Sequence, residues 1–161
     1  RDLVRLLEKY QNIYVKIVGF MQLEGKLKKY QTQGRVIFEE LVPYPKLQYE
    51  IGGVDVNMIP LVANDFNQAK SELKFFEAGI VKVPSCMTPT EVYQNLVCDG
   101  VDGLFCNPGE WFDKIELLYQ NAKFRKQIGQ KAYEKVCQNY LNETKTHLIE
   151  EVYQKLECLP R

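Results

Sequence analysis

Short runs rich in β-branched residues alternate along this chain with longer segments of helical periodicity. Residues 13–18 (IYVKIV) are almost continuously apolar, which is typical of a strand buried on both faces of a parallel sheet. Parallel strands need a long crossover connection, so this alternation favours βαβ units. We therefore predict an α/β fold with about five parallel strands and a helical C-terminal tail.

The same patterns give the bounds of the expected elements. Strands are predicted at 13–18, 35–39, 55–60, 81–84 and 103–106, and helices at 2–10, 26–30, up to residue 50, 71–78 and 90–97. Gly52 and Gly53 are expected to end a helix as an αL cap, and residues 63–68 to form a polar loop. Two amphipathic helices follow Pro108, and a last helix is expected at 143–156. The apolar faces of these two helices are predicted to comprise Trp111, Ile115, Leu118 and Ala122 in the first and Phe124, Ile128, Ala132 and Val136 in the second.

Length and charge place the chain in the class of single globular domains. Its 161 residues suffice for one core, so we expect one domain over 1–161. The chain has 21 Lys and Arg residues and 21 Asp and Glu residues, so its charges balance. This balance argues against the basic surface of a general nucleic-acid binder. The sequence contains no run of about 18 apolar residues of the kind that spans a membrane. The absence of an initiator Met, with helical periodicity from Leu3, leads us to expect a piece excised from a longer protein.

The cysteine count and spacing favour free thiols. The five cysteines are odd in number and show no zinc-like spacing. We expect reduced, buried thiols in a cytoplasmic protein. His147, the only histidine, is expected on a solvated helix face rather than in catalysis. Neither GxSxG nor GxGxxG is present, and no metal site is predicted.

The first candidate site is the segment 64–79 (NDFNQAKSELKFFEAG). Helical spacing places Ala69, Leu73, Phe76 and Ile80 on one apolar stripe.

Three charged residues, Lys70, Lys74 and Glu77, are predicted to lie together beside that stripe. Lys70 and backbone N–H groups near Ser71 would suit an anion, and Glu77 could accept hydrogen bonds from a diol. The alternative is that Lys74 and Glu77 form an ordinary surface ion pair.

The second candidate site is the segment 85–95 (SCMTPTEVYQN), which precedes the helix predicted at 90–97. Thr88 or Thr90 could cap this helix, and Pro89 suits a turn or a first helical turn. Backbone N–H groups there could bind a phosphate. Simple helix capping explains the same residues.

The order of four sequence blocks resembles a known family. DVNMIPL, KSELKFFEAGIVKVPS, TPTEVYQNLVCDGVDGLFCNPGEWFDKIELL and FRKQIGQKAYEKV follow one another between residues 36 and 140. They resemble the carboxyl-terminal half of a group 1 (family 4) glycosyltransferase of GT-B architecture, which has two facing Rossmann-like domains. The resemblance implies a Rossmann-like three-layer sandwich that binds a nucleotide-sugar donor.

The resemblance also implies roles for individual residues. Glu77 would bind the donor ribose, while Lys70, Thr88, Pro89 and Thr90 would contact the diphosphate. The backbone of Leu41, Val42 and Pro43 would face the base. The family motif places a second Glu eight positions before the ribose Glu, and this chain has Ala69 there. Recognition of the donor sugar by that acid is therefore not expected.

From these implications we expect a retaining glycosyltransferase, acting in bacterial surface polysaccharide or glycolipid synthesis, whose catalytic residues remain unassigned. The resemblance implies no cofactor, an N-terminal acceptor domain that is missing from this chain, and peripheral membrane association of the full-length enzyme as an open possibility. Two alternatives remain: a non-catalytic α/β interaction domain with a degenerate donor site, and half of a nucleotide-sugar epimerase. The fragment alone is expected to be inactive, since a two-domain cleft holds the acceptor.

Overall fold

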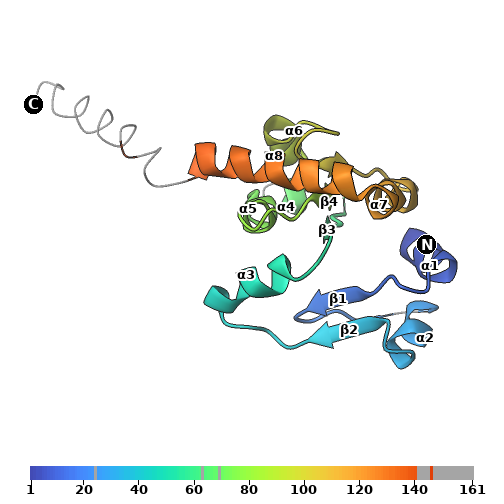
Figure 1. The fold of residues 1–161 in the computed structure, drawn as a ribbon. Helices are drawn as coiled ribbons and strands as arrows, with labels where there is room; N and C mark the ends of the chain where they lie inside the picture. The colour runs from blue at the N-terminus through green and yellow to red at the C-terminus, as the bar shows by residue number, and fades with distance from the viewer. Residues whose placement is uncertain (24, 63, 69, 141–145, 147–161) are drawn as a thin grey trace, which may run out of the picture.

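The computed structural model describes all residues except 24, 63, 69, 141–145 and 147–161. Helices and strands alternate as predicted (Figure 1). The strands are β1 (Val15–Val18), β2 (Val36–Glu39), β3 (Asn57–Ile59), β4 (Ser85–Met87) and β5 (Leu104–Phe105). The helices are α1 (Asp2–Lys9), α2 (Leu27–Thr32), α3 (Tyr44–Gly52), α4 (Asp65–Gln68), α5 (Leu73–Gly79), α6 (Glu91–Leu96), α7 (Trp111–Gln120) and α8 (Ala122–Tyr140).

All assigned strand pairings are parallel. β1 pairs with β2 from Val15↔Val36, and the second group has the order β3-β4-β5. A helix connects the two strands of each pair, so the βαβ prediction is confirmed. The five strands nevertheless form two hydrogen-bonded groups rather than one continuous sheet. Apolar packing joins the groups, because Ile13 before β1 and Met58 of β3 contact the same core cluster.

Two local predictions around α3 and α5 are wrong. Gly53 ends α3 with a φ of −84°, so no αL cap is present there. The strand expected at 81–84 begins instead at Ser85. Lys82 has a φ of 61°, in the left-handed region, so the chain is still turning where the strand was expected.

The predicted polar loop at 63–68 contains the single helical turn α4. Its start is stabilised by the Asn64 carboxamide, whose Oδ1 accepts a hydrogen bond of 2.8 Å from the Asn67 N–H. The Asn67 side chain in turn donates to the Val62 carbonyl oxygen at 2.8 Å. Two Asn side chains therefore fix the backbone just after β3.

The helical tail is present in α7 and α8. Ile115 and Leu118 of α7 are buried, as are Ile128, Ala132 and Val136 of α8, which confirms most of the predicted faces. Ala122, predicted on the buried face, is exposed because it lies at the start of α8. The helix expected at 143–156 lies outside the described residues except for Thr146, and His147 and Cys158 also lie outside them.

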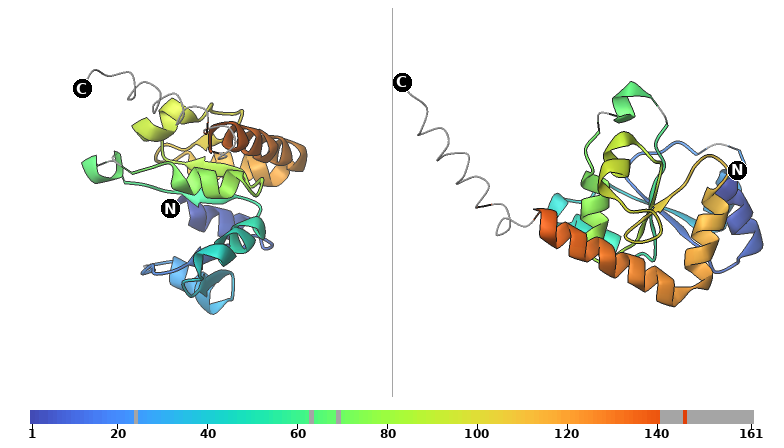
Figure 2. Two further views of the ribbon diagram at one scale, coloured as in Figure 1. Left: turned by 90° about the vertical axis from the view of Figure 1, so that its left-hand side faces the viewer. Right: turned by 90° about the horizontal axis from the view of Figure 1, so that it is seen from above.

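Close contacts between α5 and α8 require small residues. A Cβ added at Gly79 would lie 2.7 Å from Cγ2 of Val136, and one added at Gly129 would overlap the Lys82 carbonyl oxygen. The two helices cross at close range in both Figure 1 and the right-hand view of Figure 2. In the described part of the chain, no helix has the length and apolar character needed to cross a bilayer.

Candidate functional site

The polar residues predicted to act together lie on and before α5. This helix begins at Leu73, two residues later than predicted, so Lys70 and Ser71 lie in irregular backbone before it. The predicted apolar stripe is confirmed only in part: Phe76 and Ile80 are partly buried against a core cluster, but the most buried positions of α5 and the position of Leu73 differ from the prediction. Phe75, Ala78 and Gly79 form the buried face, whereas Leu73 is 46% exposed. Packing against α8 at Gly79 explains this orientation. Ala69 lies outside the described residues.

Glu77 is the most unusual polar residue of α5. Its side chain is 7% exposed and makes no hydrogen bond or ion pair with any described residue. No fully buried side-chain oxygen in the described part of the chain lacks a partner, so the Glu77 carboxylate oxygens must still reach solvent. Burial raises the pKa of the Glu77 carboxyl, and the charge of Lys74 opposes this effect. The surface-pair alternative is wrong, because Glu77 is buried and not paired with Lys74.

The cations near Glu77 are exposed. The Lys70 ammonium lies 4.8 Å from the centroid of the Phe66 ring and makes no ion pair with a described residue. Lys74 and Ser71 are also exposed. Lys70 does not share a helix face with Lys74 and Glu77, because it precedes the helix. The positive charge therefore comes from a loop and from one helical residue.

Thr88, Pro89 and Thr90 connect β4 to α6. The Thr88 hydroxyl oxygen accepts a hydrogen bond of 2.9 Å from the Leu61 N–H, which joins the ends of β4 and β3. Thr90 occupies the N-cap position of α6 but its side chain makes no capping hydrogen bond. Neither threonine side chain therefore caps α6 as the capping alternative predicted.

A residue that sequence reasoning missed fills this role instead. The side-chain oxygen of Gln68 accepts a hydrogen bond of 3.0 Å from the Glu91 N–H, at the first residue of α6. One N–H that we expected to be available for a phosphate is thus already bonded within the chain. No sequence pattern indicated this contact, which spans 23 positions.

The segment Leu41, Val42 and Pro43 lies at the same end of the strands. It follows β2, and the Leu41 side chain is 68% exposed. A Cβ added at Gly19, directly after β1, would lie 3.0 Å from Cδ2 of Leu41, so the loops after β1 and β2 touch. Pro43 leads into α3, and α3 packs against α5, which carries Glu77. The predicted base-facing and ribose-facing residues thus lie on neighbouring elements.

Two tyrosines near α5 were also missed. Tyr93 of α6 is 2% exposed, and burial together with the charges of Glu72 and Glu77 raises the pKa of its hydroxyl to about 12. Tyr140, the last residue of α8, donates a 2.6 Å hydrogen bond to Glu72 Oε1. Tyr93 lies four positions before Val97, so the two side chains share an apolar helix face. The Tyr93 hydroxyl on this apolar face was the sequence feature that could have indicated a role for Tyr93.

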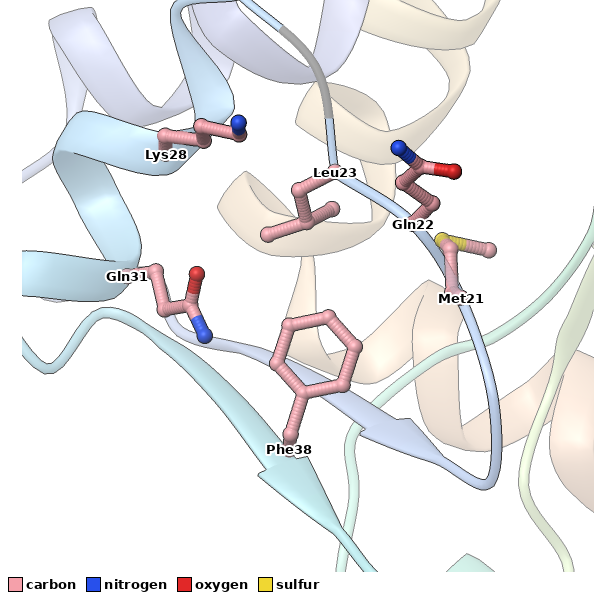
Figure 3. A pocket seen from close by; sticks show the side chains of 6 residues that line it. All are labelled: Met21, Gln22, Leu23, Lys28, Gln31 and Phe38. Atoms are coloured by element: carbon pink, nitrogen blue, oxygen red, sulfur yellow. The ribbon is translucent and has the colours of Figure 1, made fainter.

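The cavities described for this structure lie away from these residues. One of about 300 Å³ lies between α2 and the loop after β1, where the Phe38 ring of β2 and the Leu23 side chain approach each other (Figure 3). Its lining residues are Met21, Gln22, Leu23, Lys28, Gln31 and Phe38. A second, of about 220 Å³, lies around Tyr30 and Arg35. No predicted site residue lines either cavity.

The described residues contain no group of three or more His, Cys, Asp or Glu side chains that could hold a metal ion. Cys86, Cys98, Cys106 and Cys137 are free thiols. A hydrogen bond with the Cys106 thiol and burial raise the pKa of Cys86. None of these groups suggests metal or thiol chemistry.

Comparisons with known proteins support the predicted fold. No protein-family model matches the sequence, and no curated protein matches it significantly. Among solved structures, the C-terminal domain of the glycosyl transferase group 1 family protein LpcC from Francisella tularensis is similar. The TM-score is 0.69 at 18% identity, over 88% of this chain and 76% of that chain.

Two further structures of this kind carry nucleotides. Anabaena HepE in complex with UDP-glucose gives a TM-score of 0.73 at 18% identity, over 96% of this chain and 44% of that chain. TarM from S. aureus, in a complex that includes UDP, gives 0.70 at 17% identity, over 94% and 31%. This chain therefore spans less than half of HepE and about a third of TarM. It has the Rossmann-like fold of the C-terminal domain of GT-B, group 1 glycosyltransferases.

Proposed function

We propose that this chain is the donor-binding domain of a retaining glycosyltransferase, which transfers a sugar from a nucleoside diphosphate sugar to an acceptor. The observation that carries the proposal is Glu77, a buried carboxylate that reaches solvent and lacks a partner among the described residues. Such a group costs stability unless it binds something. The complex of HepE with UDP-glucose, a protein of the same fold, favours a nucleotide-sugar ligand.

Each predicted donor contact has a defined part in this proposal. The ionised Glu77 carboxylate accepts hydrogen bonds from the two ribose hydroxyls. Lys70, with Ser71 and Lys74 nearby, attracts the diphosphate. Thr88, Pro89 and Thr90 shape the loop beside it. The backbone at Leu41, Val42 and Pro43 faces the base.

The chemistry that follows is stabilisation of the leaving group. As the bond between sugar and diphosphate breaks, negative charge develops on the diphosphate, and a cation already in place lowers the barrier. Lys70 supplies this charge without a metal. We further propose that the acceptor is bound by a second domain, that the protein is bacterial and cytoplasmic, with peripheral membrane association, and that it acts in surface polysaccharide or glycolipid synthesis.

Titration calorimetry of the 161-residue chain with UDP, GDP and ADP tests the proposal. We expect at least one of them to bind with a dissociation constant below about 1 mM, a free energy of about −4 kcal/mol. Failure of all three to bind would favour the non-catalytic interaction domain. Ala69 in place of the family acid, and the Glu91 N–H already bonded to Gln68, favour that second candidate.

A further inference from the structure

Tyr93 of α6 has a hydroxyl that makes no hydrogen bond with any described residue. The side chain is 2% exposed and belongs to the core cluster that includes Phe75 of α5 and Val136 of α8. No fully buried side-chain oxygen in the described part of the chain lacks a partner. The Tyr93 hydroxyl oxygen must therefore lie on the small part of this side chain that reaches solvent.

Packing alone does not explain the Tyr93 hydroxyl. Taking a polar group largely out of water without giving it a hydrogen bond is unfavourable. A phenylalanine ring would fill the same space in the core cluster without this cost. The hydroxyl is therefore suited to a partner that comes from outside the chain.

Two residues of the proposed donor site share this property with Tyr93. Glu77 and Thr90 are also buried, and neither side chain has a hydrogen-bond partner among the described residues. Thr90 lies three positions before Tyr93, so the two lie on the same side of α6. Glu77 lies on α5, whose Phe75 and Phe76 belong to the cluster of Tyr93 or pack against it. Three nearly buried polar groups that reach solvent thus border one part of the core.

Glu77 and Tyr93 offer complementary halves of a hydrogen-bonding site. Burial and the charges of Glu72 and Glu77 raise the pKa of Tyr93 to about 12, so its hydroxyl stays protonated and can donate. The Glu77 carboxylate can only accept. A ligand hydroxyl both donates and accepts, so it can bond to both groups at once. A phosphate oxygen would instead be repelled by the charge of Glu77.

We propose that Tyr93 is a ligand-binding residue of the donor site: its hydroxyl donates a hydrogen bond to the oxygen of one ribose hydroxyl, which itself donates to Glu77. This inference rests on the donor-binding function proposed above. It also makes the site selective for ribose over deoxyribose. A ligand that lacks the shared hydroxyl leaves both Tyr93 and Glu77 without a partner.

Calorimetric titrations of Tyr93→Phe with UDP test this role, using GDP or ADP instead if either binds more tightly. The substitution keeps the ring in the core and removes only the hydroxyl. We expect the affinity for UDP to fall roughly threefold to tenfold. The melting temperature should stay the same or rise, because the hydroxyl has no internal partner. Tyr30→Phe, at a buried tyrosine of α2, is the matched control and binds UDP like the wild type.

Titrations with 2′-deoxy-UDP and 3′-deoxy-UDP identify the atom that Tyr93 contacts. One of these two ligands already lacks the shared hydroxyl, so Tyr93→Phe should bind it as tightly as the wild type does. Equal losses of affinity for UDP and for both deoxy ligands would overturn the inference, because the Tyr93 hydroxyl would then contact another part of the ligand.

Two further results would overturn the inference while leaving the proposed function intact. One is a Tyr93→Phe variant that binds UDP like the wild type while Glu77→Gln binds it more weakly. The other is a clear drop in the melting temperature of Tyr93→Phe, which would reveal an internal partner for the hydroxyl. A wild-type chain that binds no nucleotide overturns the proposed function and this inference together.

Discussion

Lys74 lies one helical turn before Glu77 on α5, and its charge lowers the pKa of the Glu77 carboxyl by less than burial raises it. The ionised carboxylate is therefore less favourable in the folded chain than in the unfolded chain. A protein that keeps such a group without an internal partner loses stability by doing so. Ligand hydroxyls that reach Glu77 would supply the missing hydrogen bonds.

This relationship predicts how stability depends on pH. An acid whose pKa is raised by folding binds more protons in the folded state, so stability falls as pH rises from about 4.5 through the raised value. Glu77→Gln removes this loss. We expect the variant to have a higher free energy of unfolding than the wild type at pH 7, and no advantage at pH 3. Urea denaturation at both pH values measures the difference.

Glu134→Gln is the control with the opposite sign. Hydrogen bonds from Lys131 and Gln130 lower the pKa of Glu134, so its contribution to stability is present above its ordinary pKa and lost in acid. Its substitution should lower stability slightly at pH 7. A Glu77→Gln variant less stable than wild type at pH 7 would show that Glu77 has a stabilising partner.

We expect substitution of Arg35 to lower the free energy of unfolding strongly. Its buried guanidinium donates to the Leu7 carbonyl oxygen at 2.8 Å and to the Ile13 carbonyl oxygen at 3.0 Å, which joins α1 and the segment before β1 to the residue that precedes β2. Arg35→Met leaves these carbonyls without donors and should cost about 2 to 4 kcal/mol. Denaturant unfolding measures it against Lys126→Met, an exposed control expected within about 0.5 kcal/mol of wild type. An equally small effect of Arg35→Met would contradict a stabilising role for the Arg35 hydrogen bonds.

Substitution of Gly129 tests how closely α8 packs against the turn after α5. A Cβ at this position overlaps the backbone of Lys82, which cannot move aside like a side chain. Gly129→Ala should therefore destabilise the protein by about 1 to 3 kcal/mol, although alanine favours helices. Thermal unfolding of Gly129→Ala and of the neighbouring exposed Gln130→Ala provides the comparison. Stabilisation of Gly129→Ala would mean that α8 packs less closely.

We expect the stability of the protein to be insensitive to reductant. The four described cysteines are free, and the raised pKa of Cys86 keeps its thiol protonated. The melting temperature should be the same with and without dithiothreitol. A large decrease in dithiothreitol would reveal a structural disulfide.

The sequence patterns predicted the order of helices and parallel strands but not every boundary. Periodicity located β1 and α7, where apolar runs are long. It failed at 81–84, where apolar residues form a turn whose Lys82 adopts a left-handed conformation. It also misplaced the most buried face of α5, because the fit against α8 at Gly79 sets the rotation of this helix. Tertiary packing decided both cases.

Residue types indicated the candidate site, whereas its contacts depended on the fold. The position of Glu77 followed from the resemblance, but its burial without an ion pair could not be seen from spacing alone. The bonds from Glu91 to Gln68 and from Tyr140 to Glu72 join residues 23 and 68 positions apart. Local periodicity carries no information on such pairs.

The affinities of Glu77→Gln and Lys70→Ala for UDP and for uridine test the donor site most directly. Glu77→Gln should weaken both ligands about tenfold to a hundredfold, because both contain the ribose hydroxyls. Lys70→Ala should weaken UDP more than uridine, since a lone ammonium recognises the phosphate charge. Glu134→Gln and Lys126→Ala should bind like the wild type. Equal nucleotide affinity in the wild type, Glu77→Gln and Lys70→Ala would contradict the donor-site assignment and favour the interaction domain.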